Sequence, residues 1–355
     1  MIFSFFFLSL LILLSLKYKT KSVVFIYAVW FLLIFIDYTF VQNTFVPFSK
    51  DFDFFFVSFS LIFIFNYLVF DCLFSFSKIK FAKYKFISYQ LYYLFSVYLA
   101  FISIFLCIKA FATMPILVVR SKIAANELSF HVGISFPFIS SCLFFQNTNA
   151  IKKKKGFLII LLFTLAIISS SKQFIVLAFL FSIPWYTRKF KISLFAFIAI
   201  GVLGFLMILI LHALTGRVAG TGNLIQKTIY TINGYLLGGI AVFQLFLDGV
   251  MQSNITTGGW VKTGKWIGNV YSGFYNFYQN RNVFILSIKI ISISFLYASL
   301  NINRKSIFSN FMRIYSIYPL LFFIFADLFF PAISQWIIFS CAGFGLCLIK
   351  KGKGA

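Results

Sequence analysis

Residues 152–189 read KKKKGFLIILLFTLAIISSSKQFIVLAFLFSIPWYTRK, two apolar runs with basic residues at both outer ends. A short polar turn, Ser169-Ser170-Ser171-Lys172, separates the two runs. Cytoplasmic loops of membrane proteins carry an excess of Lys and Arg. The stretch therefore predicts two membrane helices whose outer ends both lie in the cytoplasm and whose connecting turn lies outside.

The same alternation of basic clusters and apolar runs extends along the whole chain. Further clusters are Lys17, Lys19 and Lys21; Lys78, Lys80, Lys83 and Lys85; Lys191; Arg304, Lys305 and Arg313; and Lys350, Lys351 and Lys353. A membrane-spanning helix needs roughly 20 apolar residues. On this measure, eleven spans are predicted near 2–16, 23–41, 54–75, 87–111, 129–146, 156–170, 173–188, 191–213, 283–300, 313–330 and 332–349. With the N-terminus outside and the C-terminus inside, every basic cluster lies in the cytoplasm.

Composition excludes a soluble globular protein. Of the 355 residues, 61% are hydrophobic and only 11% are charged, whereas ordinary domains carry about 25% charge. The net charge of +24 comes from short clusters between apolar runs, so it indicates membrane topology and anionic lipid rather than nucleic acid. We therefore expect an all-α polytopic membrane protein, with residues 1–355 forming a single integral membrane domain.

Metal and cofactor motifs are missing from the sequence. The five cysteines lie in apolar segments without the paired spacing of zinc or disulfide frameworks. No His, Asp and Glu residues have metal-ligand spacing, and P-loops, nucleophile elbows and dinucleotide fingerprints are absent. The sequence therefore predicts neither a metal nor a cofactor.

The predicted topology places a long connection, residues 214–282, outside the cell membrane. Within it, Leu236, Ile240, Phe243 and Leu247 recur at the spacing of one helical face. This stripe predicts an amphipathic helix at the membrane surface. Long connections in compact proteins are usually functional, so the segment is where a site is first sought.

Basic residues on the predicted outer side run against the positive-inside bias. They include Arg120, Lys122, Lys172, Arg217, Lys227, Lys262, Lys265 and Arg281, of which Arg120, Lys172, Arg217 and Arg281 are the candidates for binding pyrophosphate. Arg recognises phosphate bidentately and Lys adds a point charge, so as a set they favour an anion such as a polyprenyl-linked pyrophosphate. The alternative is that each side chain extends to lipid headgroups.

Four residues on the same side are candidates for a general base. They are His131, His212, Glu127 and Asp248. Histidine titrates near neutral pH, and Glu127 lies one helical turn from His131. The sequence does not choose among the four.

Three segments carry short motifs in a fixed order. Thr215-Gly216-Arg217 is followed by Tyr230 and then by GYLLGGIAVF at residues 234–243. Residues 268–275 read GNVYSGFY. Together with the Ser169–Lys172 turn, these segments resemble the O-antigen polymerases, which are Wzy-type oligosaccharide repeat-unit polymerases. Spacing, topology and chain length are similar to that family over nearly the whole chain.

The resemblance implies a bacterial inner-membrane glycosyltransferase, related to the O-antigen ligases, with a GT-C-like helical architecture. Such an enzyme transfers a growing glycan from undecaprenyl pyrophosphate to the sugar hydroxyl of a new lipid-linked repeat unit on the periplasmic face. The product is O-antigen or capsular polysaccharide, and a chain-length regulator is an implied partner. The four cations would stabilise the leaving pyrophosphate without a metal.

Aromatic residues of the long segment are candidates for contact with sugar rings. They are Tyr230, Tyr235, Tyr271, Tyr275 and Tyr278. Tyrosines at a membrane interface also form anchoring belts, so both roles stay open.

Two other functions fit parts of the sequence. Ten residues separate Arg120 from His131, a spacing that resembles membrane O-acyltransferases of surface glycans. Those enzymes also need a histidine in their first span, which this chain lacks. A flippase for lipid-linked oligosaccharide is expected to place cations within its spans, whereas here they gather at one surface.

Overall fold

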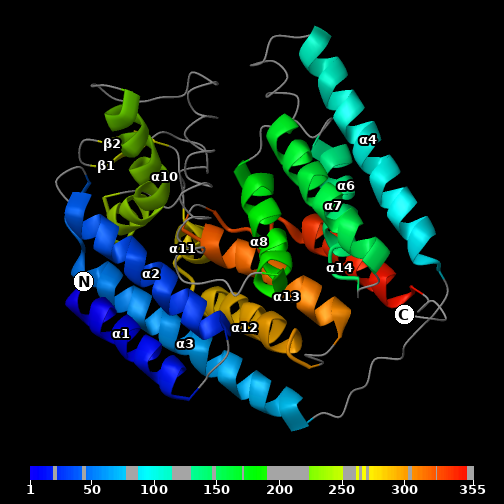
Figure 1. Ribbon diagram of the computed structural model, residues 1–355. Coiled ribbons are helices and arrows are strands. Elements are labelled where there is room, and N and C mark those ends of the chain that lie inside the picture. The colour runs from blue at the N-terminus through cyan, green and yellow to red at the C-terminus, as the bar shows by residue number, and fades with distance from the viewer. Residues whose placement is uncertain are drawn as a thin grey trace. The chain divides into compact units, whose positions relative to one another are not determined.

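The fold is described by a computed structural model (Figure 1). It describes residues 1–18, 22–41, 45–76, 87–113, 129–145, 149–169, 172–189, 224–250, 261–263, 266–268, 272–302, 306–324 and 326–349. The helices are α1 (Ile2–Lys17), α2 (Ser22–Val41), α3 (Lys50–Phe76), α4 (Tyr89–Thr113), α6 (Ser129–Cys142), α7 (Asn149–Ile168), α8 (Lys172–Lys189), α10 (Leu224–Leu247), α11 (Gly273–Tyr278), α12 (Val283–Ser299), α13 (Ile307–Phe322) and α14 (Ile333–Cys347). Strands β1 (Val261–Thr263) and β2 (Trp266–Gly268) form an antiparallel pair in which Val261 faces Gly268.

The chain divides into two compact units. Unit 1 comprises Met1–Ile79, Ala219–Ile302 and Pro319–Ile333. Unit 2 comprises Lys80–Val218, Asn303–Tyr318 and Ser334–Ala355. The single integral membrane domain over 1–355 stays a prediction.

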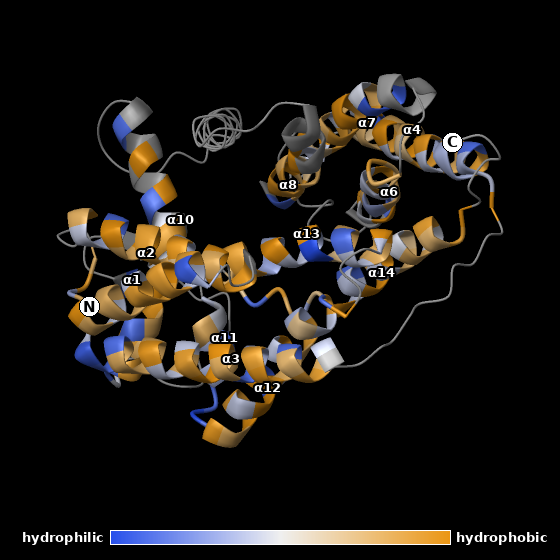
Figure 2. Cartoon of the chain, turned by 60° about the horizontal axis from the view of Figure 1, so that its bottom comes forward, coloured by the Kyte–Doolittle hydropathy of each residue, from blue (hydrophilic) through white to orange (hydrophobic). Residues whose placement is uncertain are grey.

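Apolar helices dominate both units, as the prediction of an all-α membrane protein requires. Among the described residues, three helices are long and apolar enough to cross a membrane, Val23–Val41, Lys50–Ser75 and Tyr89–Thr113. Shorter apolar helices occupy Ile2–Lys17, Gln173–Ile183, Leu236–Leu247, Val283–Ser299 and Ile333–Cys347. Hydrophobic residues run along most of α2, α3 and α12 in Figure 2. The total of eleven spans and the GT-C-like arrangement stay predictions.

Helix α4 shows how these helices suit lipid. Its buried side chains are Tyr92, Ser96, Ala100, Ser103, Cys107 and Ala110. By contrast, Phe101 and Phe105 expose 53% and 66% of their surface. Small residues let membrane helices approach closely, while large apolar residues are stable against lipid. The polar hydroxyls stay inside, where Ser103 Oγ lies 2.6 Å from Ser135 Oγ of α6.

Each predicted span overlaps a helix except 191–213, which lies outside the described residues. Residues 152–189 form the predicted pair of helices, α7 and α8, whose Phe163 and Phe179 rings pack edge to face. The predicted span 313–330 differs from the structure, because α13 ends at Phe322 and residues 326–332 are not helical. There the Asp327 carboxylate accepts the backbone N–H groups of Phe329 and Phe330, which gives the chain a local alternative to helix.

Three helices of unit 1 run in the same direction. Ser294 of α12 donates to the carbonyl of Phe63 in α3, and Asn301, just beyond α12, donates to the Tyr67 hydroxyl further along α3. Helix α1 also begins beside the start of α3, since Asp53 accepts the Ser4 backbone N–H at 3.0 Å. The spans 2–16, 54–75 and 283–300 are predicted to cross in one common direction, as these helices do, and the side from which they enter stays a prediction.

Helix α10 confirms the prediction that the segment 214–282 contains a helix, but the surroundings of this helix differ from the prediction. A helix at the membrane surface should bury one stripe, whereas residues 237–244 are buried on every side. Gly239 makes this possible, because a Cβ there would lie 2.3 Å from the Ile324 carbonyl oxygen. The second half of α10 is therefore a core helix of unit 1.

Candidate functional site

The C-terminal end of α10 brings together polar groups from four elements of unit 1. Gly249, with φ +75°, ends the helix in the left-handed conformation. Val250 N donates to Leu245 O and Gly249 N donates to Phe246 O, which is the Schellman arrangement. This turn leaves Asp248 exposed at the end of the helix.

Ser49 connects this carboxylate to the start of α3. Its hydroxyl oxygen accepts the backbone N–H groups of Asp51 and Phe52, as an N-capping residue does. The same hydroxyl donates to Asp248 Oδ1 over 2.8 Å. Ser49 therefore caps one helix and holds an acid at the end of another.

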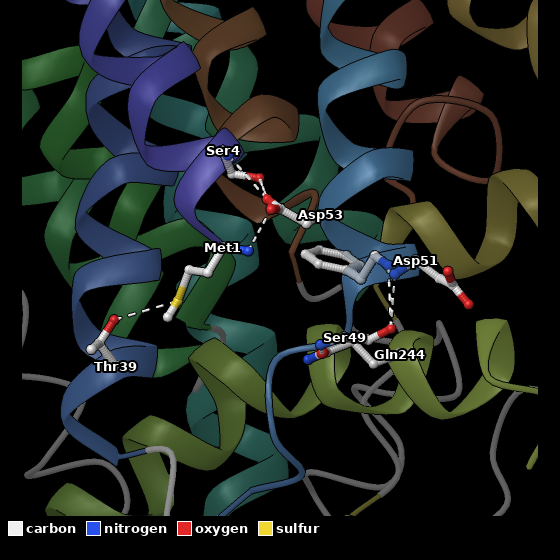
Figure 3. Close-up of polar contacts among 8 residues, drawn as sticks. Met1, Ser4, Thr39, Ser49, Asp51, Asp53 and Gln244 are labelled. Atoms are coloured by element: carbon white, nitrogen blue, oxygen red, sulfur yellow. Dashed lines mark hydrogen bonds and ion pairs between the residues drawn. The ribbon is translucent and has the colours of Figure 1, made fainter.

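A buried amide lies directly behind Ser49. The side-chain oxygen of Gln244 accepts the Ser49 backbone N–H at 2.5 Å, and its Nε2 donates to the Tyr38 hydroxyl at 2.8 Å. Tyr38 in turn donates to the Val46 carbonyl. Figure 3 shows Gln244 of α10 beside Ser49, and nearby the first residues of α1 directed at Asp53.

Arg281 reaches the same helix end from the connection between α11 and α12. Its guanidinium donates to the Phe246 carbonyl at 2.7 Å and lies over the Phe246 ring at 4.8 Å. Its φ of +50° is unusual for a residue with a side chain. A cation here complements the negative end of the helix dipole. Among the described residues the guanidinium makes one hydrogen bond, although it has five N–H donors and its side chain is exposed.

The two described tyrosines of α11 pack against this region. The Tyr275 ring lies 5.2 Å from Phe246 and is buried, and burial raises the pKa of its phenol. The Tyr278 ring lies 5.3 Å from Phe55 and is half-buried. Of the two, Tyr278 offers more of its surface to a ligand.

The two long motifs of the sequence meet in the core beneath this end. A Cβ at Gly239 would lie 3.0 Å from the Ser272 nitrogen, so the α10 motif touches the start of the GNVYSGFY motif. Their rings also stack, with Phe243 6.0 Å from Phe274. Gly273 N donates to Phe323 O at 2.6 Å and ties both to the segment after α13.

The predicted site residues fall into four groups. Asp248, Arg281, Tyr275 and Tyr278 are brought together around the ends of α10 and α11. Outside the described residues lie Arg120, Glu127, His212, Arg217 and Tyr271, while Lys172, Tyr230 and Tyr235 lie on described helices without described side chains. His131 belongs to α6 of unit 2, where its side chain is exposed and its carbonyl accepts the Ser103 and Ser135 hydroxyls.

Sequence reasoning missed Ser49, Gln244, Tyr38 and Lys50. Lys50 is exposed at the first residue of α3, next to the Asp248 contact. It lies in the connection 42–53, between the predicted spans 23–41 and 54–75, which the predicted topology places outside. A search for basic residues on the predicted outer side, which selected Arg281, would therefore have found it. Gln244 directly follows the GYLLGGIAVF motif. A polar residue within such an apolar run could have indicated a buried hydrogen-bonding role.

The fold and these contacts define a helical membrane protein with a polar site at one end of unit 1. Comparison with known proteins adds a relative: the chain is 25% identical to an O-antigen polymerase of Shigella dysenteriae, over 91% of this chain and 90% of that protein. No protein-family model and no solved structure matches. At this modest identity, the similarity supports the resemblance to O-antigen polymerases.

Proposed function

We propose that this protein is a glycosyltransferase that polymerises lipid-linked oligosaccharide repeat units into O-antigen or capsular polysaccharide. The observation that carries the proposal is the similarity to the Shigella dysenteriae O-antigen polymerase along nine-tenths of both chains. The apolar helices of both units support a place in the bacterial inner membrane. The proposed orientation has the N-terminus outside, the C-terminus in the cytoplasm and catalysis on the periplasmic face.

The reaction moves a glycan from one lipid carrier to another. The acceptor sugar hydroxyl attacks the anomeric carbon of the donor glycan, and the bond from that carbon to undecaprenyl pyrophosphate breaks. The bonding electrons leave with the pyrophosphate, and the hydroxyl proton passes to a base. We propose that Arg120, Lys172, Arg217 and Arg281 stabilise the leaving group without a metal.

Aromatic residues would hold the sugars. Tyr278 is half-buried at the end of α11, and its ring supports contact with a sugar face. Tyr230, Tyr235, Tyr271 and Tyr275 complete the proposed set. A chain-length regulator is the proposed protein partner.

Deletion of the gene tests this function. A strain without the polymerase should carry a single repeat unit on its lipid A core, because flipping and ligation still work. A gel of extracted lipopolysaccharide should then show one band above the core, and the plasmid-borne gene should restore the ladder. Loss of all surface glycan would instead identify a flippase, and ladders of normal length without acyl groups would identify an acyltransferase.

A further inference from the structure

The hydrogen bonds behind Asp248 form one chain in which every donor is assigned. Tyr38 donates to the Val46 carbonyl, Gln244 donates to Tyr38, and the Ser49 N–H donates to Gln244. The Ser49 hydroxyl oxygen already accepts two backbone N–H groups of α3, so its own hydrogen is available for Asp248. Each group therefore fixes the next, and the chain ends on the carboxylate.

This chain of hydrogen bonds begins at fully buried side chains, passes through the half-buried Ser49 and ends on an exposed carboxylate. Tyr38 and Gln244 have 0% exposure, whereas Asp248 is exposed at the end of α10. A buried amide is unfavourable unless its hydrogen bonds are made, and an apolar residue would pack between α10 and α2 without that requirement. The amide does hold Ser49 in place, and Ser49 holds the acid.

Only one carboxylate oxygen of Asp248 receives the Ser49 hydroxyl. The other oxygen has no hydrogen bond within the described residues, and the side chain is open to solvent. On the same helix end, two residues earlier, the Phe246 carbonyl holds the Arg281 guanidinium. The last turn of α10 thus carries a positioned acid and also holds, through the Phe246 carbonyl, a cation with further donors.

We propose that Asp248 is the catalytic residue that accepts the proton of the acceptor hydroxyl, and that Ser49 and Gln244 are positioning residues that hold it. This assignment rests on the proposed function. As the new bond forms between the hydroxyl oxygen and the anomeric carbon, the proton moves to the free carboxylate oxygen. The electron pair of the broken bond leaves with the pyrophosphate, and the proton later passes to water.

The test uses the full-length protein in nanodiscs and lipid-linked repeat units extracted from the deletion strain. Asp248→Asn keeps the shape and removes the base, so the polymerisation rate should fall by about 10²–10⁴-fold with little change in KM. Asp51→Asn is the matched control. Asp51 is an exposed acid like Asp248, but it lies in the first turn of α3 rather than at the end of α10. That variant should retain the wild-type rate.

Substitutions of Ser49 separate positioning from helix capping. Ser49→Thr keeps the cap and the donor, whereas Ser49→Gly keeps an adequate cap, adds no charge and cannot donate to Asp248. We expect wild-type rates for the first and a loss of at least tenfold for the second at equal thermal stability. Equal rates for both variants would overturn the positioning role, even if Asp248→Asn is inactive.

The failures of the two proposals are distinguishable. If the wild-type gene does not restore the lipopolysaccharide ladder in the deletion strain, the proposed function is wrong. If it does restore the ladder and Asp248→Asn polymerises at the wild-type rate, only the assignment of Asp248 is wrong.

Discussion

Gly239 of α10 lies against the backbone of Ser272, so that a Cβ at position 239 would stand 3.0 Å from the Ser272 nitrogen. The two residues come from the two motifs that most resemble O-antigen polymerases, and they are separated by a strand pair in the chain. Their contact places the two motifs side by side in the core of unit 1. One supplies a helix with a flat side, and the other supplies the turn that packs onto it.

Replacing this glycine should therefore damage the core. In Gly239→Ala the new methyl group would meet the Ile324 carbonyl oxygen at 2.3 Å, and backbone cannot move aside as a side chain can. We expect a loss of stability of about 1–3 kcal/mol, the usual cost of overpacking. The measurement is the thermal midpoint of the purified protein together with its amount in the membrane.

Gly133→Ala is the control for that substitution. Gly133 lies in α6 and nothing lies within 4 Å of its Cβ position. Alanine should be neutral or stabilising there by about 0.5–1 kcal/mol. If both variants behave alike, the contact between Gly239 and Ile324 does not limit packing.

Topology is the second prediction. We expect a reporter fused after Lys154 to be cytoplasmic and a reporter fused after Asp248 to be periplasmic, because the basic clusters alternate with the apolar spans. Paired alkaline phosphatase and green fluorescent protein fusions at both positions measure this. A periplasmic Lys154 would overturn the orientation and every site placed on the outer side.

The sequence predicted where most of the described helices lie, but it did not predict what surrounds each helix. Hydropathy and basic clusters located α1–α4, α7, α8, α12 and α14 because each contains a continuous apolar run. The end of α13 was missed because the apolar residues that follow it are packed as irregular backbone around Asp327. The burial of α10 was missed because its apolar stripe is equally compatible with a membrane surface and with a protein core.

The candidate site was predictable only in part. Arg281 follows from its position against the positive-inside bias, and Asp248 follows from being an acid on the predicted outer side. Their partners do not, since Ser49 and Gln244 are 195 residues apart in the chain and no local pattern joins them. Tyr275 was predicted to bind glycan, yet its ring is buried beside Phe246. Its role in glycan binding stays a prediction.

Packing of α4 gives the third prediction. Ala100 has 0% exposure and belongs to the small-residue side of the helix, so Ala100→Leu should force the helices of unit 2 apart. We expect a loss of about 1–3 kcal/mol and reduced protein in the membrane. Phe101→Leu is the control, because Phe101 is 53% exposed and exchanges one apolar surface for another. Equal accumulation of both variants would contradict this packing.

Alkaline sensitivity is the fourth prediction. Burial raises the pKa of Tyr275, so the neutral phenol favours the folded state below the unfolded pKa of about 10. This contribution is lost as pH rises through the raised value, because the folded protein must then accommodate a buried phenolate. Tyr275→Phe should lose less stability than the wild type between pH 9 and about pH 11. Thermal midpoints at several pH values measure the difference, and parallel curves would show that Tyr275 does not contribute.

Arg281 has an observed contact at the end of α10 and a proposed role in binding pyrophosphate, and substitution can separate the two. Its backbone has φ +50°, which glycine adopts freely, so Arg281→Gly relieves the backbone while removing the guanidinium. Loss of the contact with Phe246 O costs stability, and the relaxed backbone offsets part of that loss. We expect the thermal midpoint of Arg281→Gly to lie close to the wild-type value.

The polymerisation rate of the same variant should fall much further, and this is the fifth prediction. If the spare guanidinium donors hold the leaving pyrophosphate, their removal costs about 2.7–4 kcal/mol of transition-state stabilisation, or roughly a hundred- to thousandfold in rate. Arg281→Lys should rescue only partly, since it keeps the charge and loses the bidentate fork. Lys17→Ala, which removes an exposed cation from the predicted cytoplasmic end of α1, is the control and should keep the wild-type rate. A wild-type rate in Arg281→Gly would show that this arginine only stabilises the end of α10.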